Sequence, residues 1–285
     1  MAATISRRSI LLASSFLLRA GVKPMQHLQV AGEWCFIAVP DQPTNRAVII
    51  LDGNGTTVDA SSSSWEKDAA CAALTQAFLD AGFVVAQSNR TAHPDNGMWG
   101  NAASQNATLE LISLLRKKYG IERFNALSVS AGGVTLLNLL LDGKASFEAA
   151  ALFSSVISLE SMYRCPGGFD RVKGIAEAYN FRPAHGCPGD PEHDAEFRRT
   201  TEGFDPMRRI ASGLPKNWNG AKTSWMVLYH HGDPKVLPPE NGARLVELLR
   251  RAALPVKVVA IDGSTHNSDD LMHDNLKDIV QFMLL

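Results

Sequence analysis

The sequence predicts an α/β fold in which a mostly parallel central sheet is flanked by helices. From Arg46 onward, short apolar runs alternate with stretches of helical periodicity, the arrangement that builds a parallel sheet with helices on both faces. The clearest of these runs are apolar throughout, as expected of strands that are buried on both sides. The length of 285 residues, with 45% hydrophobic and 20% charged residues, allows one large globular domain.

The chain begins with a segment that we predict separately from the domain. Arg7 and Arg8 precede a mainly apolar run from Ile10 to Leu18, a pattern that resembles a twin-arginine export signal. An amphipathic helix packed on the domain is the alternative, because the run is short and no clear cleavage site follows it. We assign residues 1–26 to this segment and residues 27–285 to the domain. A cytoplasmic and an exported location both stay open, and no segment reaches the roughly 20 apolar residues that span a bilayer.

The strands are predicted from runs of β-branched, aromatic and small apolar residues. An antiparallel pair is expected between His27 and Val39, in front of about six core strands. The core strands are Ala47–Leu51, Phe83–Ala86, Phe124–Val129, Ala149–Phe153, Trp225–Tyr229 and Val256–Ile261.

The helices are predicted from apolar residues that recur three and four positions apart between these strands. They cover Glu66–Asp80, Ala102–Tyr119, Val134–Leu141, Glu240–Arg251 and Leu271–Met283. Gly82 and Gly120 follow the first two helices closely, as expected of glycines that end helices.

One connection is too long for a plain crossover between two strands. Residues 154–224, about 70 in number, separate the fourth and fifth core strands, and so long a connection needs structure of its own. Helical patterns at Asp170–Tyr179 and Glu192–Thr201, with Pro/Gly-rich stretches between them, predict a lid insertion over the sheet rather than a separate domain.

Composition disfavours several classes of partner. Lys plus Arg number 28 against 29 for Asp plus Glu, so no overall field draws the chain to nucleic acid or anionic lipid. The 4 cysteines lack C-x-x-C spacing, which argues against zinc, and are too few for a disulfide scaffold. Pairing of Cys165 with Cys187 stays open beside free thiols. His230 and His231 point to opposite faces of a strand and do not share a metal ion, so no metal is expected.

A sharp strand-to-helix turn is predicted at Ser130. The strand from Phe124 runs into Ser128-Val129-Ser130-Ala131-Gly132, and a helix begins near Val134. This segment resembles the nucleophile elbow of the α/β-hydrolase superfamily, whose G-x-S-x-G motif places its serine above the sheet. Here Ser128 stands in place of the first glycine. The resemblance covers most of residues 46–285 apart from the predicted lid, and it implies an α/β-hydrolase fold.

The resemblance also implies a catalytic triad, in the chain order serine, acid, histidine. Asp233 follows the strand ending at Tyr229, and His266 follows the last strand. In such a triad the imidazole takes the proton of Ser130, and the carboxylate holds the imidazole in the correct tautomer. Glu160, which follows the fourth core strand, is the alternative acid.

An oxyanion hole is expected from backbone N–H groups beside the serine. The family takes one donor from the residue after the nucleophile, here Ala131, and another from a loop after an earlier strand, for which we choose Asn54. Asp52 stands in that loop where many relatives have His. We expect Gly53 and Trp99 to line the substrate pocket.

The function implied by the resemblance is hydrolysis of an ester through an acyl-enzyme on Ser130, without a cofactor. An amide or peptide hydrolase and an acyl-transferring or cyclising enzyme are alternatives on the same triad. A non-catalytic binding protein with this fold is a further hypothesis, because fold does not dictate function. The partner is then a small-molecule ester or amide, and the sequence sets neither its identity nor the oligomeric state.

Overall fold

The computed structural model of the chain describes residues 25–90, 99–164, 169–181, 189, 191–211 and 213–285. Residues 1–24 of the export-signal-like segment, together with Cys165 and Cys187, lie outside these residues, and Gln26 already belongs to the first strand. Within the described part, no helix is both long and apolar enough to cross a membrane.

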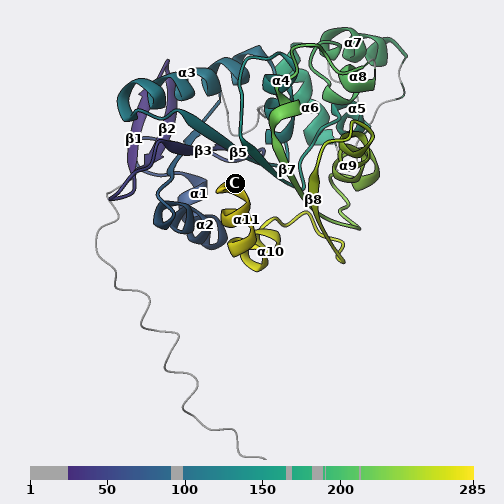
Figure 1. Ribbon diagram of the computed structural model, residues 1–285. Helices are drawn as coiled ribbons and strands as arrows, with labels where there is room; N and C mark the ends of the chain where they lie inside the picture. Colours follow the sequence, from purple (N-terminus) through teal and green to yellow (C-terminus); the bar gives the residue numbers. More distant parts are fainter. Residues whose placement is uncertain (1–24, 91–98, 165–168, 182–188, 190, 212) are drawn as a thin grey trace, which may run out of the picture.

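Eight strands form a single sheet in the order β1-β2-β4-β3-β5-β6-β7-β8 (Figure 1). β2 pairs antiparallel with β1 and β4, and all other neighbours pair parallel. The strands are β1 (Gln26–Val30), β2 (Glu33–Ala38), β3 (Arg46–Leu51), β4 (Val84–Ser88), β5 (Arg123–Val129), β6 (Ala149–Phe153), β7 (Ser224–His230) and β8 (Val256–Ile261). The predicted antiparallel pair and the mostly parallel sheet are confirmed.

Helices cover both faces of the sheet, and β3 shows why its sequence is apolar throughout. Ala47, Ile49 and Leu51 pack in one apolar cluster, whereas Val48 and Ile50 pack in a second on the opposite face. The first cluster is covered by α3 (Ala102–Tyr119), α4 (Gly132–Leu141) and α9 (Gly242–Arg251), with the short helix η2 (Pro238–Glu240) before α9. The second is covered by α2 (Ala69–Asp80), α10 (Asp269–Asp274) and α11 (Leu276–Met283), and α1 (Ser64–Lys67) precedes α2.

Two helices that were predicted to be continuous are each broken into two in the structure. The stretch Glu66–Asp80 breaks at Asp68, whose backbone is extended and whose carboxylate caps α2 by accepting from Cys71 N–H. The stretch Leu271–Met283 breaks at Asn275, whose side-chain amide donates to the Leu271 carbonyl. In both cases a short polar side chain bonds locally to the backbone, which competes with helix continuation.

The long connection carries α5 (Leu159–Tyr163), α6 (Phe169–Tyr179), α7 (Pro191–Thr201), α8 (Pro206–Ala211) and η1 (Asn219–Lys222). α5, α6 and α7 pack on a third apolar cluster, in which the rings of Tyr163 and Phe197 stack with centroids 3.9 Å apart. The same cluster contains Trp99, Ala131 and Val134. This segment is therefore packed against the turn that carries Ser130, beside α4 in Figure 1.

Candidate active site

Three side chains from distant parts of the sequence meet at one edge of the sheet. Ser130 follows β5, Asp233 follows β7 and His266 follows β8, and these strands run parallel. Because parallel strands end at the same edge, the loops after them are brought together. His266 Nε2 lies 3.0 Å from Ser130 Oγ, and His266 Nδ1 lies 2.7 Å from Asp233 Oδ2.

The turn at Ser130 is held in a conformation that non-glycine residues rarely adopt. Its φ is 47°, in the left-handed region. Ser130 N–H donates to the Phe153 carbonyl at 3.1 Å, and the Ser130 carbonyl accepts from Val156 N–H at 2.7 Å. A Cβ on Gly132 would lie 1.7 Å from the Leu51 carbonyl oxygen, so the turn approaches β3 too closely for any side chain there. Backbone contacts on both sides therefore hold Ser130 in its strained position.

Ser128, which stands where the hydrolase motif has glycine, is accommodated by a second serine. Ser128 Oγ lies 2.9 Å from Ser155 Oγ, and the Ser155 hydroxyl also donates to the Ser128 carbonyl at 3.1 Å. Both residues are buried. The departure from the motif thus adds a satisfied polar pair beneath the turn instead of a clash.

Asp233 is a fully buried carboxylate with several donors. Its side chain has no exposed surface, and its Oδ1 accepts from the backbone N–H groups of Lys235 and Val236, both at 2.9 Å. Burial alone would raise the pKa of Asp233, but the hydrogen bond from His266 and these N–H groups bring it below its usual value. The group is therefore an anion at neutral pH. In the tautomer that satisfies both contacts, His266 donates from Nδ1 to Asp233 and accepts at Nε2 from Ser130.

Solved structures that resemble this chain have the same fold at low sequence identity. A puromycin-hydrolysing peptidase from Mycobacterium tuberculosis matches 91% of this chain with a TM-score of 0.64 and 17% identity, and this chain spans only 39% of it. An S-formylglutathione hydrolase from Agrobacterium tumefaciens matches 91% of this chain and 92% of its own, with a TM-score of 0.59 and 12% identity. A hormone-sensitive lipase from a metagenome library matches 93% of this chain and 86% of its own, with a TM-score of 0.58 and 14% identity.

This chain has the α/β-hydrolase fold. The fold predicted from the sequence is therefore confirmed. No protein-family model matches the sequence, and no curated protein matches it either.

The loop after β3 lies against Ser130. A Cβ on Gly53 would lie 3.0 Å from Ser130 Cβ and 3.7 Å from Ser130 Oγ, so Gly53 lies directly beside the serine. Gly53 N–H is already bonded to Asp52 Oδ1 at 2.7 Å. Asn54 is exposed and Ala131 is buried at the start of α4.

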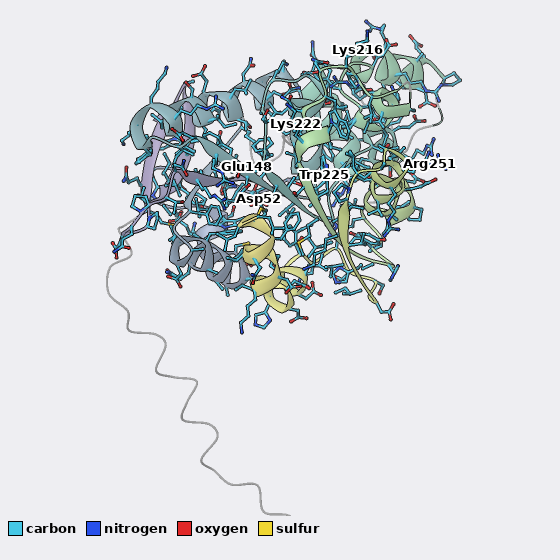
Figure 2. All side chains as sticks on the ribbon, viewed as in Figure 1. Asp52, Glu148, Lys216, Lys222, Trp225 and Arg251 are labelled. Atoms are coloured by element: carbon cyan, nitrogen blue, oxygen red, sulfur yellow. The ribbon has the colours of Figure 1, made fainter. Side chains whose placement is uncertain are left out.

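A buried arginine that the sequence analysis missed supports this loop. Arg90 is fully buried, and its Nη2 donates to the Asp52 carbonyl at 2.5 Å. Burial raises the pKa of Asp52 to about 6, although the Gly53 N–H and the charge of Arg90 oppose the rise. Burial likewise lowers the pKa of Arg90 to about 10, against the attraction of Asp52. Asp52 lies inside the fold, whereas Lys216 and Arg251 lie at its surface (Figure 2).

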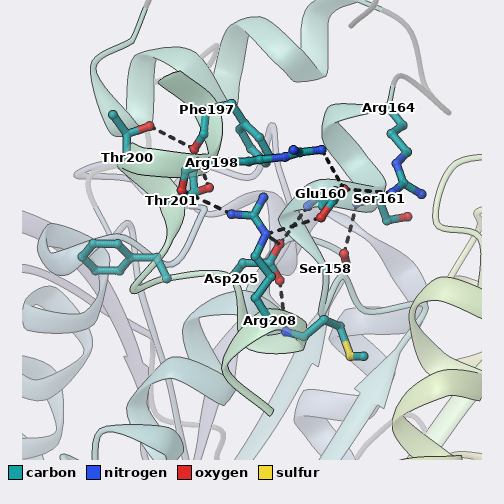
Figure 3. Close-up of polar contacts among 12 residues, drawn as sticks. Ser158, Glu160, Ser161, Arg164, Phe197, Arg198, Thr200, Thr201, Asp205 and Arg208 are labelled. Atoms are coloured by element: carbon teal, nitrogen blue, oxygen red, sulfur yellow. Dashed lines mark hydrogen bonds and ion pairs between the residues drawn. The ribbon is translucent and has the colours of Figure 1, made fainter. Parts of the chain in front are cut away.

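The structure places Trp99 and Glu160 in two different surroundings. Trp99 is fully buried in the third apolar cluster, so it packs against the Ser130 turn from within. Glu160 joins a polar cluster of the insertion, where it lies 2.8 Å from Arg164 and 3.4 Å from Arg208 (Figure 3). These arginines hold the pKa of Glu160 below its usual value although burial opposes them. The structure therefore brings Asp233, and not Glu160, to the imidazole.

Two polar side chains bond to neighbouring residues at this edge of the sheet. Asn241 is fully buried, and its Oδ1 accepts from the backbone N–H groups of Ile157 and Ser158 at 3.0 and 3.2 Å. His230 lies 2.9 Å from Asp270 through Nε2, while His231 is exposed. Among the described residues, no three His, Cys, Asp or Glu side chains form a group suited to a metal ion.

Proposed function

We propose that this chain is a serine hydrolase that cleaves an ester through an acyl-enzyme on Ser130. The observation that carries the proposal is the continuous row of hydrogen bonds from Asp233 through His266 to Ser130, at 2.7 and 3.0 Å. A serine hydroxyl is a poor nucleophile until a base removes its proton, and this row supplies the base with its orienting anion. The names of the similar structures, which include a peptidase, a lipase and a formylglutathione hydrolase, support the same class of chemistry.

In the proposed mechanism, Ser130 Oγ attacks the ester carbonyl carbon while His266 Nε2 takes the hydroxyl proton. The Asp233 carboxylate stabilises the imidazolium, which then protonates the departing alcohol. A water molecule, activated in turn by His266, attacks the acyl group and releases Ser130.

The oxyanion is proposed to accept from the backbone N–H groups of Ala131 and Asn54. Ala131 is the residue after the nucleophile, at the start of α4. In the facing loop, Gly53 N–H is occupied by Asp52, which leaves the next N–H, that of Asn54, as the second donor. The exposed side chain of Asn54 is not needed for this role, because the donor is its backbone.

The insertion between β6 and β7 is proposed to act as the lid that sets substrate size. Its helix α6 contributes Val172 and Ile175 to the cluster that also contains Ala131. A segment packed beside the nucleophile limits which acyl and alcohol groups reach it.

Hydrolysis of p-nitrophenyl esters tests the proposal. We expect release of nitrophenolate by the wild type, and a loss of several orders of magnitude in kcat for both Ser130→Ala and His266→Ala. Circular dichroism of the variants checks that they remain folded. Parallel assays with p-nitroanilides separate ester from amide hydrolysis. Equal turnover by the wild type and the Ser130 variant would contradict the proposal and favour a binding protein with this fold.

A further inference from the structure

A cation that has no hydrogen-bond or ion-pair partner among the described residues lies close to the row of Asp233, His266 and Ser130. Arg171, on α6, is partly buried. Its guanidinium is attracted by the charge of the Asp233 carboxylate. Burial lowers the pKa of Arg171, and the attraction of Asp233 opposes this. A partly dehydrated guanidinium is costly unless an anion or acceptor compensates it.

The packing of α6 fixes Arg171 beside the proposed site. Val172, the next residue, is fully buried in the cluster that contains Ala131 and Val236. Ala131 follows the nucleophile, and Val236 belongs to the loop of Asp233. The helix is thus anchored on both the serine turn and the acid loop, immediately after the position of Arg171.

The other end of α6 is tied down as well. Tyr179 Oη donates to the Trp99 carbonyl at 2.6 Å, and Asn101 Nδ2 donates to the Ala178 carbonyl at 2.9 Å. Because contacts hold both ends of α6, the backbone position of Arg171 is fixed relative to the proposed site.

Asp233 does not use the donors of Arg171. Its two oxygens already accept from Lys235 N–H, Val236 N–H and His266 Nδ1. Among the described residues, no acceptor takes the five N–H donors of the guanidinium, and their planar fork matches a carboxylate through two parallel hydrogen bonds.

We propose that Arg171 binds a carboxylate of the substrate, so that the preferred substrates are esters that also carry a carboxylate group. This inference rests on the proposed ester hydrolysis at Ser130 and adds the class of substrate. A lysine at this position would supply the positive charge but not the two parallel hydrogen bonds that a guanidinium donates to a carboxylate.

Matched pairs of esters test the inference on both sides of the scissile bond. For the acyl side, the p-nitrophenyl monoester of adipic acid is compared with p-nitrophenyl heptanoate. For the alcohol side, p-carboxyphenyl acetate is compared with its neutral amide, p-carbamoylphenyl acetate. We expect the wild type to prefer the anionic ester in at least one pair, and Arg171→Gln to lose about ten- to a hundredfold in kcat/KM for that ester. Its kcat/KM for the neutral ester should stay within about twofold.

Two further variants distinguish recognition from a general effect of charge or packing. Arg171→Lys should restore only part of the preference. Lys173→Gln removes one positive charge from an exposed position of the same helix and should leave the preference unchanged. An equal loss for anionic and neutral esters in Arg171→Gln would overturn the inference, because it would mean that the residue only supports Asp233. No preference of the wild type in either pair would overturn it too.

A binding measurement separates failure of this inference from failure of the proposed function. Adipate and p-hydroxybenzoate are added to folded Ser130→Ala protein and to Ser130→Ala/Arg171→Gln protein, and the unfolding temperature is recorded. The inference predicts that at least one of these anions raises the unfolding temperature of Ser130→Ala protein but not that of Ser130→Ala/Arg171→Gln protein. If no ester is hydrolysed but this difference is seen, only the hydrolase proposal fails. If esters are hydrolysed and the difference is absent, only the role of Arg171 fails.

Discussion

Replacing Asp52 with Asn tests the physical account of the loop beside Ser130. Asp52 is 5% exposed, and burial raises its pKa from 3.8 to about 6, because Gly53 N–H and Arg90 only partly offset the lost hydration. Between these pH values the unfolded chain has released the proton and the folded chain still holds it. The stabilisation by this group is therefore fully present below the unfolded-state pKa of 3.8. It is lost as the pH rises to the folded-state pKa of about 6. A shift of about two units corresponds to about 3 kcal/mol.

The Asp52→Asn variant stays neutral at every pH, so a comparison with the wild type isolates the titration. We expect the unfolding free energy of the wild type, minus that of the variant, to fall by about 3 kcal/mol between about pH 4 and about pH 6, and to stay level above. Urea unfolding followed by tryptophan fluorescence measures both values. The new amide has an acceptor nearby, since Gln87 Oε1 is buried without a hydrogen-bond partner in the described structure and Gln87 already faces Asp52.

Asp59→Asn is a control of opposite sign. Hydrogen bonds from the Ser61 backbone and side chain lower the pKa of this exposed carboxylate, so its contribution is present at neutral pH and is lost as the pH falls. A pH-independent difference between the wild type and Asp52→Asn would refute the reasoning about Asp52. So would a difference that grows in favour of the wild type with rising pH.

Two other predictions follow from the geometry of the site. Gly132→Ala places a Cβ 1.7 Å from the Leu51 carbonyl oxygen and should cost at least about 3 kcal/mol in urea unfolding, whereas Gly203→Ala, with no atom within 4 Å of the added Cβ, should change stability little. Similar costs for the two would show that the serine turn is not closely packed on β3. Asp233→Asn should lower kcat for p-nitrophenyl esters by about 10⁴-fold, the scale known for a triad aspartate, while Glu160→Gln should retain most activity. The reverse ranking would move the acid to Glu160.

Much of the fold is predictable because burial on both faces leaves a simple signal in the sequence. The run Ala47–Leu51 is apolar throughout, and its residues alternate between the two cores. The helix breaks at Asp68 and Asn275 were missed because single side chains that bond to nearby backbone end a helix without interrupting its apolar pattern.

The positions of Ser130, Asp233 and His266 follow from chain order and parallel strands, so a sequence motif locates them. Arg90 and Arg171 could not be found in this way. Arg90 acts through its hydrogen bond to Asp52, and Arg171 through its electrostatic attraction to Asp233; both partners are distant in the sequence. Such long-range pairs carry no local spacing, and a charged residue near a strand end or on a polar helix is usually solvated.

The most direct test of the account is the identity of the residue that reacts with a fluorophosphonate. The native protein is treated with the probe, digested and analysed by mass spectrometry, beside Ser130→Ala and His266→Ala proteins that retain the wild-type circular dichroism. The account predicts that the phosphonyl group is found on Ser130 of the wild type and that both variants are labelled at a small fraction of that rate. A folded wild type that is not labelled would contradict the account. So would labelling at a serine other than Ser130, at the same rate in the wild type and in both variants.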